Sequence, residues 1–271
     1  MRNKTNWPVT CLMILGSIFI LIPLFITILI ALKDPSEMVN VLSFPTKIRL
    51  QNFSDAIKMT NFWNAFFNSS IIAICTVIFT VLTNSFIAYA ITRNLDNKFF
   101  KTVYYYFVSA MFIPFPIIML PIVKQMSGWG LDNRVGLVIL YVVYGLSFNI
   151  FLYVAYIKSI SPSLDEAAYI DGASQWQVFW KIIFPLLKPI NATVTILTFL
   201  WAWNDFMLPL VILSDQTSAT LPLVQYVFQG QFSTNYNLAF ASYLMALAPV
   251  LIVYMFAQNK IIDGVTSGAV K

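Results

Sequence analysis

Long apolar runs limit what this chain can fold into more than any other feature of its sequence. Roughly six segments are apolar over about 20 residues, the length that an α-helix needs to cross a bilayer: 9–32, 66–91, 102–123, 135–157, 190–213 and 238–257. Of the 271 residues, 59% are hydrophobic and only 10% are charged, whereas soluble domains carry about 25% charged residues. The sequence therefore predicts an all-α, polytopic membrane protein with about six transmembrane helices in a single domain, 1–271.

The basic residues predict the orientation of these helices. The first apolar run follows Arg2 and Lys4, as in a secretory signal, but Val9–Leu32 exceeds the roughly 7–15 residues of a signal core, so we expect a membrane anchor. Lysine and arginine gather in cytoplasmic loops. An inside N-terminus places the larger set inside (Arg2, Lys4, Arg93, Lys98, Lys101, Lys158, Lys181, Lys188, Lys260 and Lys271) and the smaller set outside (Lys33, Lys47, Arg49, Lys58, Lys124 and Arg134). Both termini are predicted to be cytoplasmic.

The long outer connection, 33–64, is partly apolar, and it is predicted to contain a short helix that lies along the membrane surface through Phe53, Ile57, Phe62 and Trp63. Prolines within the spans predict bends, since each removes a backbone donor: Pro114, Pro116 and Pro121 in the third span, Pro209 in the fifth and Pro249 in the sixth. Such bends serve either as packing kinks or as the lining of a substrate path, and both interpretations stay open.

The inner connection, 158–189, carries the strongest local signals. Either Ser161 caps a helix that begins with Pro162, or Ser163 and Glu166 form a capping box, and Gly172 ends the helix in both cases. Ser174 and Gln177 form a second capping box, which opens a helix that runs to Pro185. We therefore expect two short helices joined by a tight turn.

The first of these helices is predicted to be a docking surface. Ala167 and Ala168 are small enough to let another protein approach closely, and Glu166 beside them offers a carboxylate to a basic partner. A solvated loop with a charged face is the alternative interpretation.

The same segment resembles a known family. Glu166-Ala167-Ala168, Gly172 and Ile182-Ile183-Phe184-Pro185 resemble, at the right spacing, the cytoplasmic signature loop of ATP-binding-cassette (ABC) importer permeases, apart from Phe184, where that family prefers leucine. Other stretches are similar to the maltose-type carbohydrate-uptake permeases, and the tail resembles that of the MalG-like subunit: Asn68-Ser69, Ala88-Tyr89-Ala90 with Arg93, Gly130-Leu131-Asp132-Asn133, Trp203-Asn204-Asp205-Phe206 and 264–271. The resemblance covers 66–271, with closely matching residues from Asn68 onward.

The resemblance implies a type I ABC importer permease fold in a bacterial inner membrane and transport of a di- or oligosaccharide by alternating access. It implies a heterodimer with a second permease, two ATP-binding-cassette ATPase subunits and an extracellular sugar-binding protein. The loop 162–185 would couple to the ATPase through Glu166, Ala167, Ala168, Asp171 and Gly172, and the cytoplasmic tail 258–271 would contact the ATPases through Gly264, Gly268 and Lys271. The chain lacks G-x-x-x-x-G-K-[ST], so the partner is expected to bind and hydrolyse ATP, with no enzyme activity and no cofactor in this chain.

Asp205 is the one acidic residue well inside a predicted span, and intramembrane carboxylates are functional candidates. It either contacts the substrate or, with Asn204, satisfies backbone donors freed near Pro209. The possible substrate path comprises Trp203, Asn204, Asp205 and Tyr243, and aromatic rings such as Trp201 and Phe206 are further candidates for stacking on a sugar.

Other function classes fit the sequence less well. An ion-coupled secondary transporter normally has several ionisable residues near the midplane, and here only Asp205 qualifies. A membrane-embedded enzyme needs paired acid and base groups, and the chain has no histidine. Its two cysteines, Cys11 and Cys75, lie in apolar runs far from acidic residues, which argues against zinc, and its basic residues are too scattered for nucleic-acid binding.

Overall fold

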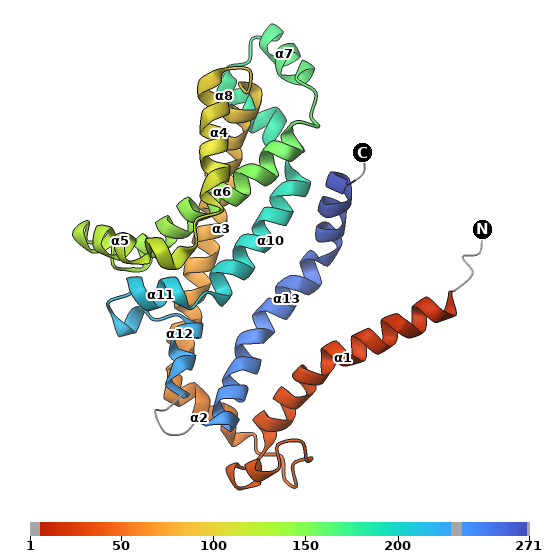
Figure 1. Ribbon diagram of the computed structural model, residues 1–271, viewed down its shortest axis with the longest axis vertical. Helices are drawn as coiled ribbons and strands as arrows, with labels where there is room; N and C mark the ends of the chain where they lie inside the picture. Colours follow the sequence, from red (N-terminus) through yellow and green to blue (C-terminus); the bar gives the residue numbers. More distant parts are fainter. Residues whose placement is uncertain (1–5, 229–234, 270–271) are drawn as a thin grey trace. The chain divides into compact units, whose positions relative to one another are not determined.

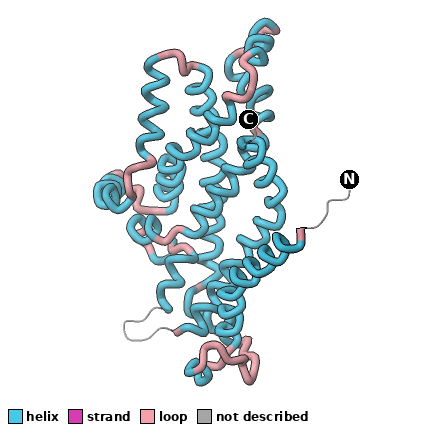
Figure 2. Tube along the Cα trace, turned by 45° about the vertical axis from the view of Figure 1, so that its right-hand side comes forward, coloured by secondary structure: helices cyan, strands magenta, loops and turns pink. Residues whose placement is uncertain are grey.

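The computed structural model describes residues 6–228 and 235–269, with side chains except those of Val39 and 256–269. Every regular element among these residues is a helix, as Figure 2 shows. The chain divides into two compact units: Met1–Trp63 with Val224–Pro249, and Asn64–Leu223 with Val250–Lys271. The predicted all-α class is confirmed.

The first unit packs three helices around small side chains. It contains α1 (Trp7–Leu32), the 3₁₀ turn η1 (Pro35–Val39), α2 (Gln51–Thr60), the 3₁₀ turn η4 (Tyr226–Phe228) and the first part of α13 (Tyr236–Ala269). Its core consists of Ala31, Ala56, Phe228, Ala239 and Ala241, and partly buried side chains, Phe53 and Tyr243 among them, pack against it. Small residues at the contacts let the helix backbones approach closely.

This core corrects the prediction for the outer connection. Phe53 packs against the core, and Phe62 is buried, so these two side chains are not the membrane-facing surface that the sequence suggested. Trp63 is exposed, as expected. The composition of a ten-residue amphipathic helix does not tell whether its apolar face meets lipid or protein.

The second unit holds most of the helices (Figure 1): α3 (Phe62–Arg93), α4 (Lys98–Ala110), α5 (Phe115–Gly128), α6 (Arg134–Ile157), α7 (Ser163–Ile170), α8 (Gln175–Gln177), α9 (Phe184–Leu186), α10 (Lys188–Asn204), α11 (Met207–Ile212) and α12 (Leu221–Gln225). The first two residues of α3 and the last two of α12 belong to the first unit. A π-helical turn, η2 (Val178–Ile183), joins α8 to α9, and a 3₁₀ turn, η3 (Gln216–Ser218), precedes α12. Within this unit α7 lies at one end and α11 lies toward the other (Figure 1).

Four helices among the described residues are long and apolar enough to cross a membrane: Trp7–Leu32, Phe62–Arg93, Arg134–Ile157 and Tyr236–Met255. Two bent pairs, Lys98–Ala110 with Phe115–Gly128 and Gln175–Leu186 with Lys188–Asn204, raise the number to six if each pair forms one span. This agrees with the predicted six-span membrane protein.

Two predicted spans are interrupted, however. The third, 102–123, contains a bend of 106° between α4 and α5, next to Pro114, which disfavours helical geometry in the residue before it. The fifth, 190–213, ends as a helix at Asn204 and resumes as α11, with Asp205 extended between them. The prolines indicated bending, but they did not predict the size of the first bend. Pro249 lies inside the uninterrupted helix α13.

Several residues of the motifs that resemble carbohydrate-uptake permeases bind loops in the second unit, at its end opposite α7. The Asn68 amide donates to the carbonyls of Thr217 (2.8 Å) and Ala219 (3.0 Å), and the Ser69 hydroxyl accepts from the Leu221 amide (2.9 Å). Asn133 caps α6 through its carboxamide oxygen. These residues therefore hold the connection after α11 against α3 and start α6.

Candidate functional site: a helical knob and an aromatic pocket

The predicted docking surface is α7 with the turn that follows it. The helix begins at Ser163 without a side-chain cap, so neither of the two predicted caps is formed, although the Ser161 hydroxyl accepts from the Ser163 amide (3.3 Å) just before the helix. The Ser174–Gln177 capping box is present as predicted. The second helix runs to Leu186, through the π-helical turn η2.

Gly172 ends α7 by a Schellman motif. Its amide donates to the Tyr169 carbonyl (3.0 Å) and the Ala173 amide donates to the Ala168 carbonyl (2.9 Å), while Gly172 has a φ of +84°. That left-handed conformation suits glycine because it lacks a Cβ atom. The predicted role of Gly172 as the helix end is confirmed.

The two faces of α7 differ sharply. Glu166, Ala167 and Asp171 are exposed, and so are the apolar side chains of Leu164 and Ile170. Ala168 is buried against α3, α6 and η2 in one hydrophobic cluster. Its small size therefore serves packing inside this chain, which corrects the prediction that Ala168 belongs to the exposed surface. We call α7 with the turn at Gly172 the knob, and its exposed residues Leu164, Glu166, Ala167 and Ile170 the knob face.

The buried face of α7 carries an ion pair that the sequence did not reveal. The Asp165 carboxylate lies 2.7 Å from an Arg93 guanidinium nitrogen, and both side chains are largely buried. The Tyr89 hydroxyl also donates to Asp165, and Arg93 donates to the Ile160 carbonyl (3.1 Å). Asp165 thus joins α7 directly to the end of α3.

Aromatic packing joins η2, which shares a buried cluster with Ala168 of α7, to α3. Phe179 of η2 lies 5.1 Å from Phe86 and 5.3 Å from Tyr89, measured between ring centroids. A hollow of about 460 Å³ lies beside these rings and is lined in part by Arg93, Tyr169 and Trp176. The knob is therefore fixed to the helices by a compact, mostly apolar core.

The predicted substrate-path residues divide between the two units. Asp205 accepts hydrogen bonds from the amides of Met207 (3.1 Å) and Leu208 (3.3 Å) and from the Tyr141 hydroxyl (2.9 Å). Its carboxylate satisfies donors at the start of α11, which is the structural role considered from the sequence. The Asn204 amide donates to the Leu200 carbonyl (2.7 Å).

The two remaining substrate-path candidates are packed against other aromatic rings. Trp203 is buried, stacked on Phe199 and edge-on to Phe66. Tyr243 belongs to the first unit, where it packs against the core beside Phe240.

A pocket in the second unit offers a better lining for a sugar. It encloses about 380 Å³ between α6, α10 and the bend before α5, and it is lined by Met111, Tyr144, Gly145, Ser147, Phe148, Asn149, Leu197, Thr198 and Trp201. Trp201 stacks on Tyr144 with ring centroids 5.8 Å apart. Aromatic faces and short polar side chains line one cavity, and of these residues only Trp201 was considered from the sequence.

Comparison with known proteins decides the family. Residues 84–266, which include the knob and Asp205, match the model of the binding-protein-dependent transport system inner membrane component. The chain belongs to this family. The match covers both candidate sites, so the permease carries them within its family-defining region.

Curated relatives agree along nearly the whole chain. The permease is 43% identical to the multiple sugar-binding transport system permease protein MsmG of Streptococcus mutans, covering 96% of this chain and 95% of the relative. It is 36% identical to the probable starch degradation products transport system permease protein AmyC of Thermoanaerobacterium thermosulfurigenes, covering 97% and 96%. It is 32% identical to the melibiose/raffinose/stachyose import permease protein MelC of Bacillus subtilis, covering 100% and 98%. The resemblance to carbohydrate-uptake permeases is confirmed.

The fold has solved counterparts as well. A chain of a bacterial ABC transporter involved in the import of the acidic polysaccharide alginate superposes with a TM-score of 0.81 at 24% identity, covering 96% of this chain and 98% of that one. This likeness confirms the importer-permease fold.

Proposed function

We propose that this permease carries a sugar of the di- or oligosaccharide class across the bacterial cell membrane by alternating access, driven by a separate ATPase subunit. Membership of the family and relatives named for the transport of sugars and starch degradation products support the substrate class. A second, homologous permease, two ATPase subunits and an extracellular sugar-binding protein complete the importer. Both termini and the knob lie in the cytoplasm, in keeping with the distribution of lysine and arginine.

The knob is the observation that carries this proposal. Its face offers one carboxylate, Glu166, among exposed apolar and small side chains, which suits insertion into a cleft with a basic residue. Its opposite face is joined to α3 through Asp165 and to η2 through Ala168. Because the knob is anchored on that side, movement of a docked ATPase is transmitted to the spanning helices. A flexible loop would instead bend and transmit little of this movement.

The same movement would open and close the aromatic pocket. Its walls come from α6 and α10, and both helices extend to the buried cluster that holds α7. We assign to this pocket a sugar contact through Tyr144 and Trp201, with Ser147, Asn149 and Thr198 as polar partners. Asp205, close by through Tyr141, shapes the start of α11.

The tail is assigned a supporting contact with the ATPases. The backbone of α13 continues as helix through Gly264 and Gly268, and Lys271 lies outside the described residues. Deleting 264–271 should leave the chain inserted in the membrane but lower ATP-driven uptake, as measured in vesicles at equal abundance. Uptake equal to wild type would remove this assignment.

Substitution of Glu166 tests the coupling. A charge-assisted hydrogen bond contributes about 1.5–3 kcal/mol, so Glu166→Ala should weaken binding of the ATPase by about ten- to a hundredfold. The assembled importer, reconstituted in vesicles with its binding protein, should lose sugar uptake, and the ATPase should dissociate during purification. Asp96→Ala, which removes another exposed carboxylate outside the knob face, is the matched control and should keep the ATPase bound. Full uptake and a retained ATPase in Glu166→Ala would contradict the proposal.

A further inference from the structure

A buried lysine organises the connection between α1 and α2. Lys33 is completely buried, and its ammonium group donates to the carbonyls of Asn40 (2.6 Å) and Val41 (2.8 Å) and to the Ser43 hydroxyl (3.1 Å). An ammonium group has three hydrogens to donate, so all of them are matched. Because Lys33 directly follows α1, these three hydrogen bonds hold the connection against the end of that helix.

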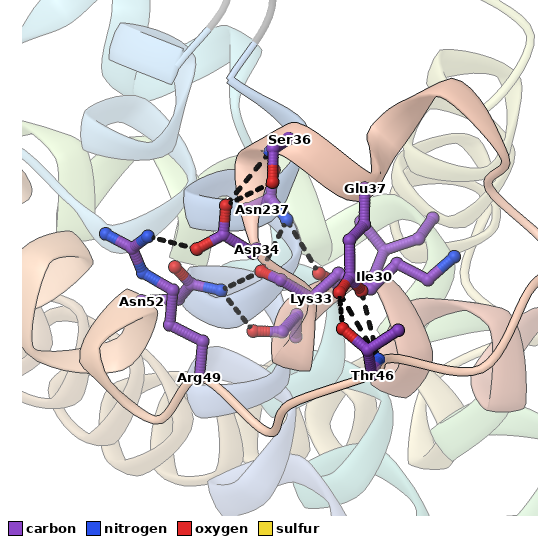
Figure 3. Close-up of polar contacts among 10 residues, drawn as sticks. Ile30, Lys33, Asp34, Ser36, Glu37, Thr46, Arg49, Asn52 and Asn237 are labelled. Carbon is purple, nitrogen blue, oxygen red and sulfur yellow. Dashed lines mark hydrogen bonds and ion pairs between the residues drawn. The ribbon is translucent and has the colours of Figure 1, made fainter.

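The carbonyl groups at that end of α1 are also satisfied, as Figure 3 shows. The Asn52 amide donates to the carbonyls of Ala31 (2.9 Å) and Lys33 (2.8 Å), and the Asn237 amide donates to those of Ile30 (3.2 Å) and Lys33 (2.9 Å). The last carbonyls of a helix lack partners within the helix. Here side chains from α2 and α13 supply them, so three helices meet at this end of the first unit.

Two further contacts close the connection on itself. Arg49 pairs with Asp34 at 2.6 Å, and Glu37 accepts hydrogen bonds from the amide and the hydroxyl of Thr46 (Figure 3). Donation from Ser36 and Arg49 lowers the pKa of Asp34 to about 2. The segment 41–50 is consequently held in one place and is not a free loop.

This fixed segment presents large apolar side chains outward. Leu42, Phe44, Ile48 and Leu50 each have an exposed fraction between 68% and 72%. We call these four residues the loop patch. An exposed apolar patch on a fixed backbone is typical of a surface that contacts lipid or another protein.

The position of the loop patch beside α1 indicates that it contacts lipid. Phe44 contacts Phe25 of α1, with the ring centroids 6.2 Å apart. Phe25 precedes Lys33 by eight residues, which is about 12 Å along a helix axis, so the loop folds back along the side of the span. The exposed residues around Phe25 are large, namely Ile18, Leu21, Ile22 and Ile28, whereas helix contacts within membranes favour small residues. This side of α1 is suited to lipid chains.

We propose that the loop patch is a membrane anchor: Leu42, Phe44, Ile48 and Leu50 lie in the interfacial layer of the bilayer, continuous with the lipid-facing side of α1. The exposed Lys47 between them reaches the lipid headgroups, as lysines at a membrane surface do. The anchor fixes how deeply α1 and the connection that Lys33 binds to it lie in the bilayer. It does not depend on the substrate or on the ATPase.

Spin labelling of the assembled importer tests the anchor. In a chain with Cys11→Ser and Cys75→Ser, a nitroxide is attached to cysteine in Phe44→Cys and, separately, in Ile48→Cys, and the importer is reconstituted in phosphatidylcholine vesicles. Collision of the label with oxygen, which concentrates in lipid, is compared with collision with a water-soluble nickel chelate. Leu21→Cys on the exposed side of α1 is the lipid reference, and Lys58→Cys on the exposed side of α2 is the water reference.

The anchor predicts that labels at 44 and 48 are relaxed by nickel much less than the label at 58, and by oxygen more than that label but less than the label at 21, which lies near the middle of α1. Strong relaxation by nickel at both positions would show a water-exposed loop and overturn the proposal. Immobile labels relaxed by neither reagent would show that protein, such as a second permease, covers the patch, and would also overturn it.

Discussion

At the scale of single residues, Asp165 has the most demanding environment. It shares a largely buried site with Arg93 and Tyr89, whereas its neighbour Glu166 is exposed. Adjacent carboxylates on one helix thus point in opposite directions, one into the chain and one toward the proposed partner. The buried carboxylate holds the helix in place and leaves the exposed one free to bind.

Removal of the Asp165 charge should damage the permease itself. Asp165→Asn leaves the Arg93 guanidinium buried without its counter-charge, and breaking a buried pair in this way costs about 3 kcal/mol or more. We expect a lower temperature of thermal inactivation and reduced uptake. The exposed Asp96→Asn, close to the same helix end, should behave as wild type. A double-mutant cycle with Arg93→Gln should show strong coupling, and additive effects would disprove the pairing.

Asp205 makes a different prediction, because hydrogen bonds to its carboxylate come from backbone amides and a tyrosine. Asp205→Asn keeps one acceptor oxygen, which can still accept from Leu208 and Tyr141 and gives up only the hydrogen bond from the Met207 amide, so uptake should stay close to wild type at equal membrane abundance. Asp205→Ala loses the cap of α11, an effect of about 1 kcal/mol, and should lower abundance or uptake. Equal loss of uptake in both variants would instead assign Asp205 to sugar binding or gating.

At the scale of elements, the turn after α7 determines where the knob points. No heavy atom lies near the place that a Cβ atom of residue 172 would occupy, so only the left-handed backbone opposes substitution. Asparagine tolerates this conformation better than alanine does, and proline cannot adopt it. Uptake should therefore decrease in the order glycine, asparagine, alanine, proline at position 172, as measured at equal abundance. Full uptake by Gly172→Pro would show that the turn geometry is unimportant.

For α7 and α8, the helix ends could be predicted from the sequence, whereas the buried contacts could not. Local rules predicted the helix end at Gly172 and the capping box of Ser174 with Gln177, because both depend on residues within one turn. They did not place Ala168 inside or pair Asp165 with Arg93, since eight residues of helix do not indicate which face meets the core. The pocket around Tyr144 and Trp201 likewise depends on how α6 and α10 pack.

At the scale of the whole molecule, the apolar runs were sufficient for the membrane class and for about six spans, since the length of a span is set by the bilayer. They did not reveal the bend of 106° within the third run, between α4 and α5, or the bend of 77° between α9 and α10, just before the fifth run. Bends of that size depend on how neighbouring helices satisfy the freed backbone groups. The bend between α4 and α5 places Met111 in the lining of the aromatic pocket.

In the proposed importer, the knob face is the surface through which an ATPase drives this permease. Because Ala167 is exposed and Ala168 is buried, neighbouring cysteines can test it in a chain with Cys11→Ser and Cys75→Ser. A thiol-attached benzophenone would be photoactivated in the assembled importer, and the cross-linked protein identified by mass spectrometry. Ala167→Cys should yield an adduct with a subunit that contains G-x-x-x-x-G-K-[ST], and Ala168→Cys should yield little or none. If importers that still transport sugar give no such adduct at 167, the knob face is not the coupling surface.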